Sequence, residues 1–179
     1  MTAGFATSIG AIVMAFITML TSLFGFIGNK PDNTVVQGFE PKEEAEMRIM
    51  SFNIRCTNVG NDSWEDRIDI VSQTMLDSEA DSIGVQEATP EWMATLKETV
   101  GEKYAYVGVG RDDGDNKGEY SAIFYLKNKY DLEDSGTFWL SETPDKVSFG
   151  WDAACRRVCT WAVLVNKETG VKYAHLNSH

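Results

Sequence analysis

The sequence predicts an α/β domain of the α+β type, in which strands and helices alternate first and strands alone follow. From Met47 to Gly101, short apolar runs alternate with segments whose apolar residues recur at helical spacing. From Tyr104 onwards, apolar runs are separated by polar and glycine-containing turns, which is typical of consecutive strands. An apolar fraction of 43% in 179 residues is enough for one such domain with a hydrophobic core.

Two helices are predicted in the first half of this domain. In "SWEDRIDIVSQTMLDSE" the apolar residues follow helical spacing, and Ser63 with Asp66 forms a capping pair at its start. In "TPEWMATLKETVG", Thr89 is the expected N-cap, Pro90 takes the first helical position and Gly101 ends the helix. Each helix follows a predicted strand, so the order of elements is β-α-β-α.

The predicted strands differ in how they should be buried. "MRIMSFNIR" is a short apolar strand and "DSIGVQE" is a buried one. In the second half we expect the strands "YAYVGVG", "EYSAIFYL", "GTFWLS", "VCTWAVLV" and "VKYAHLN". Both faces of "VCTWAVLV" are mostly apolar, which predicts a strand covered on both sides. The connection "NKETG" after it is typical of a hairpin.

The N-terminal part of the chain differs from the rest in composition. Residues 1–29 carry no charged side chain, and residues 4–28 are long enough to cross a bilayer as a helix. No basic residue precedes this run and no small-residue cleavage site ends it, so a membrane anchor is favoured over a cleaved signal segment or a buried soluble helix. Residues 30–46 form a polar linker, and the domain spans 47–179. We therefore expect a membrane-anchored protein with an extracytoplasmic domain, with secretion as the alternative.

The net charge argues against strong binding to nucleic acid or acidic lipid, and the cysteine spacing argues against a zinc site. The net charge of −11 gives no strong attraction to nucleic acid or acidic lipid, although metal ions could supply positive charge locally. The three cysteines, Cys56, Cys155 and Cys159, do not have the spacing of a zinc site. We expect each of them to lie in the core.

Four polar residues lie at the ends of predicted strands, where an α/β scaffold gathers a site: Asn53, Glu87, Glu119 and His179. A carboxylate there suits a hard cation such as magnesium, and a histidine beside a carboxylate can act as acid, base or phosphate partner. Each also has a plain structural alternative. Asn53 could form a bulge, Glu87 could begin a turn, Glu119 could be a solvated loop charge and His179 could be frayed.

The ordered set "MSFNIR", "DSIGVQE", "GEYSAIFY" and "HLNSH" resembles the endonuclease/exonuclease/phosphatase superfamily of metal-dependent hydrolases. The resemblance is closest to bacterial members and covers residues 47–179, and the set is specific although each motif alone is weak. It implies a four-layer sandwich of two mixed β-sheets flanked by helices. It also implies a phosphodiesterase or phosphatase that uses Mg²⁺, with Mn²⁺ as a possible substitute. The substrate is a phosphoester: nucleic acid, phospholipid headgroup or sugar phosphate.

The resemblance assigns roles to individual residues. Asn53 positions the phosphate and the metal, Glu87 is a magnesium ligand, and Glu119 orients the catalytic His179. Arg111 and Arg156 are candidates for substrate binding, because an arginine can bind phosphate in bidentate fashion, with a plain salt bridge as the alternative. The resemblance transfers no firm role to Arg111, Arg156 or Arg157.

The chain stops after "NSH", where the family pattern continues. We therefore expect a fragment that is incomplete at the C-terminus of the domain, lacks the aspartate that activates water, and is inactive alone. The alternative is a membrane-anchored, non-catalytic binding module on the same fold. No obligate protein partner is evident from the sequence.

Overall fold

The computed structural model describes residues 39, 42–43, 47–56 and 63–179, and the fold below is that of the unit from Pro41 to His179. The predicted anchor at residues 4–28 and most of the predicted linker lie outside the described residues. Within the described ranges, no helix combines the length and the apolar character needed to cross a bilayer.

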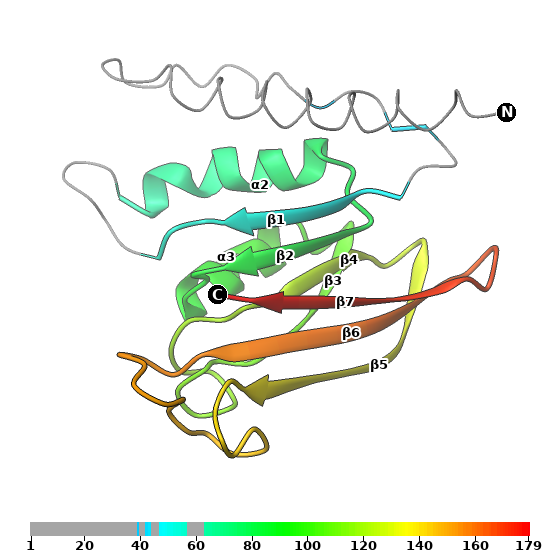
Figure 1. Ribbon diagram of the computed structural model, residues 1–179. Helices are drawn as coiled ribbons and strands as arrows, with labels where there is room; N and C mark the ends of the chain where they lie inside the picture. The colour runs from blue at the N-terminus through cyan, green and yellow to red at the C-terminus, as the bar shows by residue number, and fades with distance from the viewer. Residues whose placement is uncertain (1–38, 40–41, 44–46, 57–62) are drawn as a thin grey trace, which may run out of the picture. The chain divides into compact units, whose positions relative to one another are not determined.

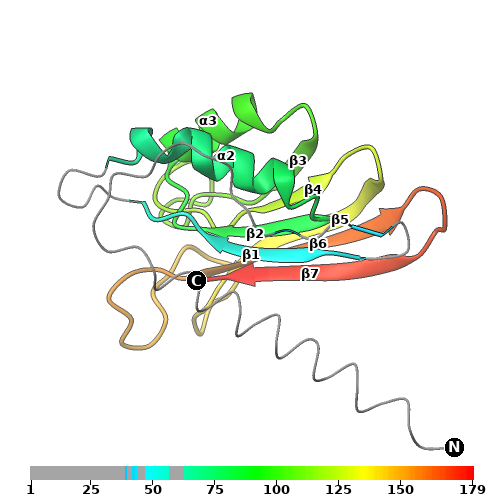
Figure 2. The ribbon, with the colours of Figure 1, turned by 90° about the horizontal axis from the view of Figure 1, so that it is seen from above.

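The first half of the domain builds a four-stranded mixed sheet with two helices on one face (Figure 1, Figure 2). Its strands are β1 (Ile49–Asn53), β2 (Ser82–Gln86), β3 (Tyr104–Val107) and β4 (Ile123–Leu126), in the order β1-β2-β4-β3. β1 and β2 are parallel, and β4 is antiparallel to both β2 and β3. Every residue of β2 is buried, as predicted for this central strand.

The helices of this half begin as the sequence predicts. A 3-10 turn, η1 (Glu65–Arg67), leads into α2 (Ile68–Asp77), and the backbone N–H of Asp66 donates to Ser63 Oγ at 3.1 Å. α3 (Pro90–Thr99) starts after Thr89, whose side chain accepts from the backbone N–H of Trp92. These bonds satisfy donors that a helix leaves unpaired at its first turn.

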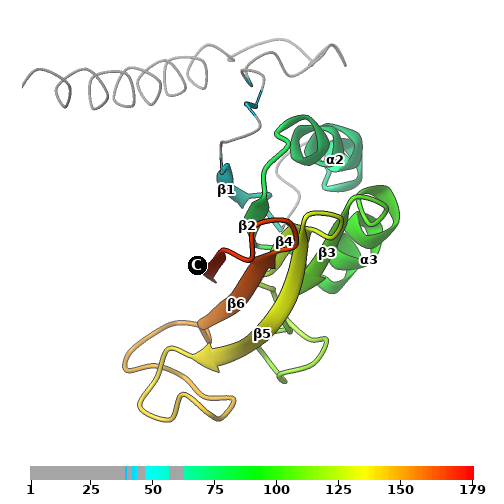
Figure 3. The same cartoon turned by 90° about the vertical axis from the view of Figure 1, so that its right-hand side faces the viewer.

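The second half forms a three-stranded antiparallel sheet in the order β5-β6-β7, which packs against the face of the first sheet opposite the helices (Figure 3). Its strands are β5 (Tyr130–Trp139), β6 (Val158–Asn166) and β7 (Lys172–Ser178). The sandwich of two sheets with helices outside is thus confirmed. In the described part of the chain the layers are helices, a mixed sheet and an antiparallel sheet.

Several strand predictions need correction. The predicted strand "EYSAIFYL" begins only at Ile123, so Glu119 lies four residues before β4 and does not open it. β5 begins at Tyr130, earlier than the predicted "GTFWLS", because its first residues belong to an acidic edge segment with a register shift between Leu132 and Asp134. β6 is not covered on both sides. Leu164 and its neighbours on the inner face are buried, whereas Trp161 and Val163 on the other face are only partly buried, since no described element covers that face.

The cysteine prediction also needs correction. Cys159 is buried, but Cys56 and Cys155 are only partly buried. Cys56 follows β1 and Cys155 precedes β6, so both lie in connections at the ends of strands, where surrounding elements do not enclose them.

Candidate functional site

Asn53, Glu87 and His179 lie at one rim of the sandwich, where β1, β2 and β7 end (Figure 1). The parallel pairing of β1 with β2 sets Asn53 opposite Gln86, so Glu87 follows at the same edge. β7 ends at this rim from the other sheet, one residue before His179. The predicted convergence of these side chains is observed.

Glu87 is held by two hydrogen bonds. The side-chain amide of Asn53 donates to Glu87 Oε1 at 2.8 Å, and the backbone N–H of Cys56 donates to Oε2 at 2.9 Å. Burial raises the pKa of the Glu87 carboxyl, but these bonds and the nearby His179 outweigh it, so that the net pKa lies below the usual value. Glu87 is therefore a carboxylate at neutral pH.

The backbone around Glu87 is strained. Glu87 has φ +62° and Arg55, two residues after Asn53, has φ +63°, although neither is glycine. The Asn53 side chain stabilises this turn, because its Oδ1 accepts from the Arg55 backbone N–H at 2.9 Å. Strain of this kind is concentrated at functional sites, where the surrounding structure enforces it.

The relation between Glu119 and His179 is looser than the sequence predicts. Glu119 Oε2 lies 4.0 Å from His179 Nδ1, which is beyond hydrogen-bond distance. The carboxylate instead accepts from Arg111 Nη1 at 2.8 Å, and the Arg111 backbone N–H donates to the Glu119 carbonyl. Glu119 is thus near the histidine and bound to Arg111.

The two candidate substrate-binding arginines both form ion pairs. Arg111 binds Glu119, and Arg156 Nη1 lies 3.4 Å from Asp112 Oδ1. Arg156 also stacks over the Phe149 ring, with its guanidinium carbon 4.4 Å from the ring centroid. Both guanidinium groups are already engaged by carboxylates.

Two residues at the rim were not predicted as site residues. Arg157 Nη1 lies 3.2 Å from His179 Nδ1. Cys56 lies beside Glu87 and Glu119, and burial together with these carboxylates raises the pKa of its thiol to about 11, so the thiol stays protonated. No local sequence signal marks either residue, because both contacts depend on how distant strands are paired.

The donor set fits a magnesium ion that has one protein carboxylate. Mg²⁺ is usually bound by one or two carboxylates and keeps waters and substrate phosphates as its other ligands. Each oxygen of Glu87 accepts one hydrogen bond and retains a further lone pair for a cation. Across the described residues, no cluster of three or more acidic, histidine or cysteine side chains could form a closed metal cage.

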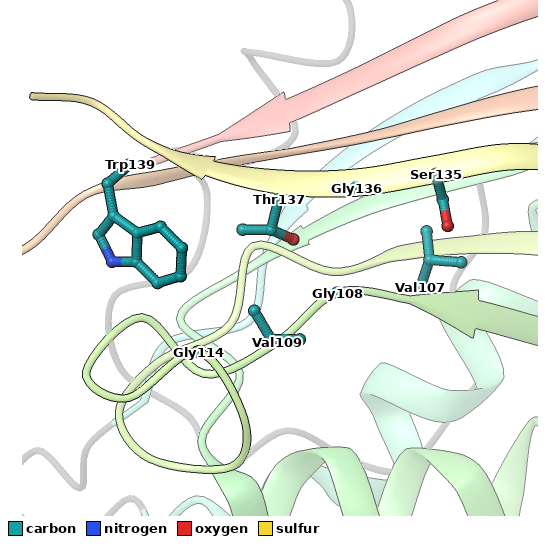
Figure 4. A pocket seen from close by; sticks show the side chains of 8 residues that line it. All are labelled: Val107, Gly108, Val109, Gly114, Ser135, Gly136, Thr137 and Trp139. Carbon is teal, nitrogen blue, oxygen red and sulfur yellow. The ribbon is translucent and has the colours of Figure 1, made fainter. Parts of the chain in front are cut away.

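A separate groove lies between the segment after β3 and the strand β5 (Figure 4). It has a volume of about 280 Å³ and is lined by residues that include Val107, Gly114, Thr137 and Trp139. Trp139 Nε1 donates to the Arg111 carbonyl at 2.8 Å. The described residues that line this groove carry no charged side chain, so it offers neither an acid nor a base for catalysis.

Several solved structures are similar to this chain in both fold and sequence. An endonuclease/exonuclease/phosphatase from Bacteroides vulgatus is 43% identical, with a TM-score of 0.69, over 72% of this chain and 50% of that one. This chain is similar to members of the endonuclease/exonuclease/phosphatase family in both sequence and fold. A mannosyl-6-phosphatase of this family from Bacteroides thetaiotaomicron is 40% identical, with a TM-score of 0.71, over 75% of this chain and 51% of that one.

More distant family structures share the fold alone. The human Nocturnin catalytic domain is 19% identical with a TM-score of 0.57, over 73% of this chain and 48% of that one. The chain therefore spans about half the length of the family structures that it matches. No protein-family model matches the sequence, and no curated protein matches it.

Proposed function

We propose that the chain forms the phosphate- and metal-binding part of a magnesium-dependent phosphoester hydrolase. One observation carries this proposal: Asn53 and His179, from different sheets, meet beside the Glu87 carboxylate, with Asn53 Nδ2 3.3 Å from His179 Nε2. The similarity to a mannosyl-6-phosphatase, at 40% identity, supports hydrolysis of a phosphoester as the reaction class.

The roles of the residues follow from their chemistry. Glu87 would hold Mg²⁺, with Mn²⁺ as a substitute, and the bound ion would polarise the phosphoryl group. Asn53 holds Glu87 in place through its amide, which would also contact a phosphate bound beside the metal. His179 contacts the phosphoryl oxygens from the opposite sheet.

We expect slow turnover from these groups alone. Hydrolysis needs a base to activate water, and the two carboxylates of the described rim are engaged elsewhere. Glu87 accepts from Asn53 and Cys56, and Glu119 is bound to Arg111. Because catalytic groups that act as a unit fail together, an incomplete set gives little rate enhancement.

Metal binding is the direct test. Mn²⁺ binding to the full chain is measured by electron paramagnetic resonance, and hydrolysis of a generic phosphoester is followed with and without magnesium. Glu87→Gln removes the carboxylate charge, and we expect it to weaken Mn²⁺ binding about tenfold or more and to abolish residual magnesium-dependent turnover. The control is Glu91→Gln, at an exposed position in the first turn of α3.

The outcomes distinguish the proposed hydrolase from the non-catalytic binding module that the sequence offers as the alternative. Equal Mn²⁺ affinity in the wild type and Glu87→Gln would show that Glu87 does not bind the metal, and it would therefore contradict the proposed reaction. Because only slow turnover is expected, the assay uses a high protein concentration and a long incubation, and metal binding at Glu87 with no hydrolysis under these conditions would favour the non-catalytic module.

A further inference from the structure

Two hydrogen-bond donors face the ring of His179 from opposite sides. Arg157 Nη1 lies 3.2 Å from Nδ1, and Asn53 Nδ2 lies 3.3 Å from Nε2. The orientation of the Asn53 amide is fixed, because its Oδ1 accepts from the Arg55 backbone N–H while its Nδ2 donates to Glu87.

A neutral imidazole cannot accept both bonds. One of its nitrogens carries a proton and donates, so only the other can accept. The nearest carboxylate oxygens, of Glu87 and Glu119, lie 3.7 Å and 4.0 Å from the ring nitrogens, too far for a hydrogen bond. Donors therefore outnumber acceptors around His179, which is the arrangement that an anion bound among them would satisfy.

Arg157 differs from its neighbours in its partners. Arg111 and Arg156 are each paired with a carboxylate. In the described part of the chain, no carboxylate lies within salt-bridge distance of Arg157, and its close side-chain partner is the His179 ring. Its charge is thus not neutralised by an adjacent acid, in a protein with a net charge of −11.

The backbone places Arg157 at the rim. The antiparallel register sets Cys159 opposite Ser178, so the residues just before β6 lie beside the end of β7. The Leu140 backbone N–H donates to the Arg157 carbonyl at 2.8 Å, which extends the β5–β6 ladder to this position. Arg157 is therefore held by two strand pairings.

We propose that Arg157 binds the phosphoryl group of the substrate together with Asn53 and His179, and that it selects a terminal phosphate over a phosphodiester. This rests on the proposed function of the same rim. A terminal phosphate offers three non-bridging oxygens and nearly two negative charges, whereas a diester offers two oxygens and one charge. The planar guanidinium can bind two of these oxygens at once, which leaves the third for Asn53, His179 or a cation at Glu87.

The test measures binding, so it does not depend on turnover. The full chain is titrated with methyl phosphate, dimethyl phosphate and inorganic phosphate, with magnesium, at about pH 8, where the second phosphate ionisation is complete. Isothermal titration calorimetry gives the affinities, and NMR of the His179 ring reports where the ligand binds. The variants are Arg157→Ala, Arg157→Lys and, as a control that also removes one positive charge, Lys97→Ala at an exposed position of α3.

We expect the wild type to bind methyl phosphate about tenfold or more tightly than dimethyl phosphate, because one further charge-assisted contact is made. Arg157→Ala should reduce this ratio to near one, and Arg157→Lys should retain part of it, since lysine keeps the charge without the planar fork. Lys97→Ala should keep the wild-type ratio. The NMR spectrum of each variant verifies that it is folded.

Three results would overturn the proposal: no saturable phosphate binding by the wild type, equal affinity for the two methyl esters, or an unchanged ratio in a folded Arg157→Ala. The proposed function can fail separately. Selective phosphate binding that depends on Arg157, without metal binding at Glu87 or hydrolysis, would retain the role of Arg157 and reject the hydrolase.

Discussion

The side-chain amides of Gln86 and Asn177 meet between the two sheets, where Gln86 Nε2 donates to Asn177 Oδ1 at 2.6 Å. The other half of the Asn177 amide donates to the backbone carbonyls of Val85 and Ala122, each at 2.9 Å. Asn177 is only 5% exposed. Three buried hydrogen bonds therefore fasten β7 to the first sheet, two residues before His179.

Replacing Asn177 by alanine should destabilise the protein by about 2–4 kcal/mol, because it removes three buried hydrogen bonds, each worth about 0.5–1.5 kcal/mol. Denaturant unfolding gives the free energy, and the His179 ring resonance should shift because β7 loses its attachment. Asn116→Ala, at an exposed loop position, should change stability by less than about 0.5 kcal/mol. Equal effects of the two substitutions would contradict the role of Asn177.

A second prediction concerns Gly84, which faces Asn177. A Cβ added at Gly84 would lie 2.8 Å from Cγ and Oδ1 of Asn177, closer than real Cβ contacts. Gly84→Ala should therefore cost about 1–3 kcal/mol by overpacking. In the double variant with Asn177→Ala this clash is absent, so the two costs should fall short of additivity. Strictly additive costs would show that the two positions do not meet.

The third prediction is a loss of stability in mild acid that depends on His175. Its Nδ1 lies 2.7 Å from Ser82 Oγ between the sheets, and burial lowers the pKa of the ring below its usual 6.5. The unfolded chain then binds more protons than the folded chain at pH values below 6.5. Stability should be full above that pH and fall progressively below it.

Urea denaturation across this pH range measures the effect. His175→Gln should flatten the dependence. A wild-type profile that is flat below neutral pH, or one that His175→Gln leaves unchanged, would contradict this account.

The fourth prediction concerns Asp81, whose carboxylate is fully buried. It accepts from Lys129 at 2.7 Å, from the Tyr130 hydroxyl at 2.8 Å and from the Arg48 backbone N–H at 2.7 Å, and it pairs with Lys42. Burial raises its pKa, but these partners together lower it to about 2.

The unfolded chain therefore takes up this proton first as the pH falls from about 4 towards 2, so the Asp81 contribution to stability is present above that range and lost through it. Asp81→Asn should remove about 2 kcal/mol at neutral pH and reduce the acid dependence. Acid titration followed by circular dichroism measures both. Asp77→Asn, at the end of α2, is the control, and the prediction fails if the two variants behave alike.

The sequence predicted the elements whose signals are local. Thr89 caps α3 and Ser63 caps the turn before α2, because each bond spans three residues. Asn53 and Glu87 could be placed together, since parallel strands in a β-α-β unit bring their carboxyl ends to one edge. These features could be predicted because hydrophobic periodicity and helix capping depend on residues that are close together in the sequence.

The missed features depend on register between distant strands. Arg157 meets His179 only because β6 and β7 pair with Cys159 opposite Ser178. Asn177 is a polar residue at the end of the predicted strand "VKYAHLN", and the packing of the two sheets buries it. Arg111 and Glu119 were both named as site residues, yet their mutual ion pair follows from the backbone of the loop that connects them.

The division of the rim between two sheets has a consequence for the order of folding. Asn53 and His179 are 126 residues apart in the chain, and bringing such distant groups together costs about 4 kcal/mol in loop-closure entropy. The strands that pair in the first sheet are closer together in the sequence, whereas the anion site exists only once β7 has docked. Phosphate added during refolding should therefore leave the rates of the early folding phases unchanged. It should slow the unfolding of the completed protein, so phosphate binding measures when the last step of folding has taken place.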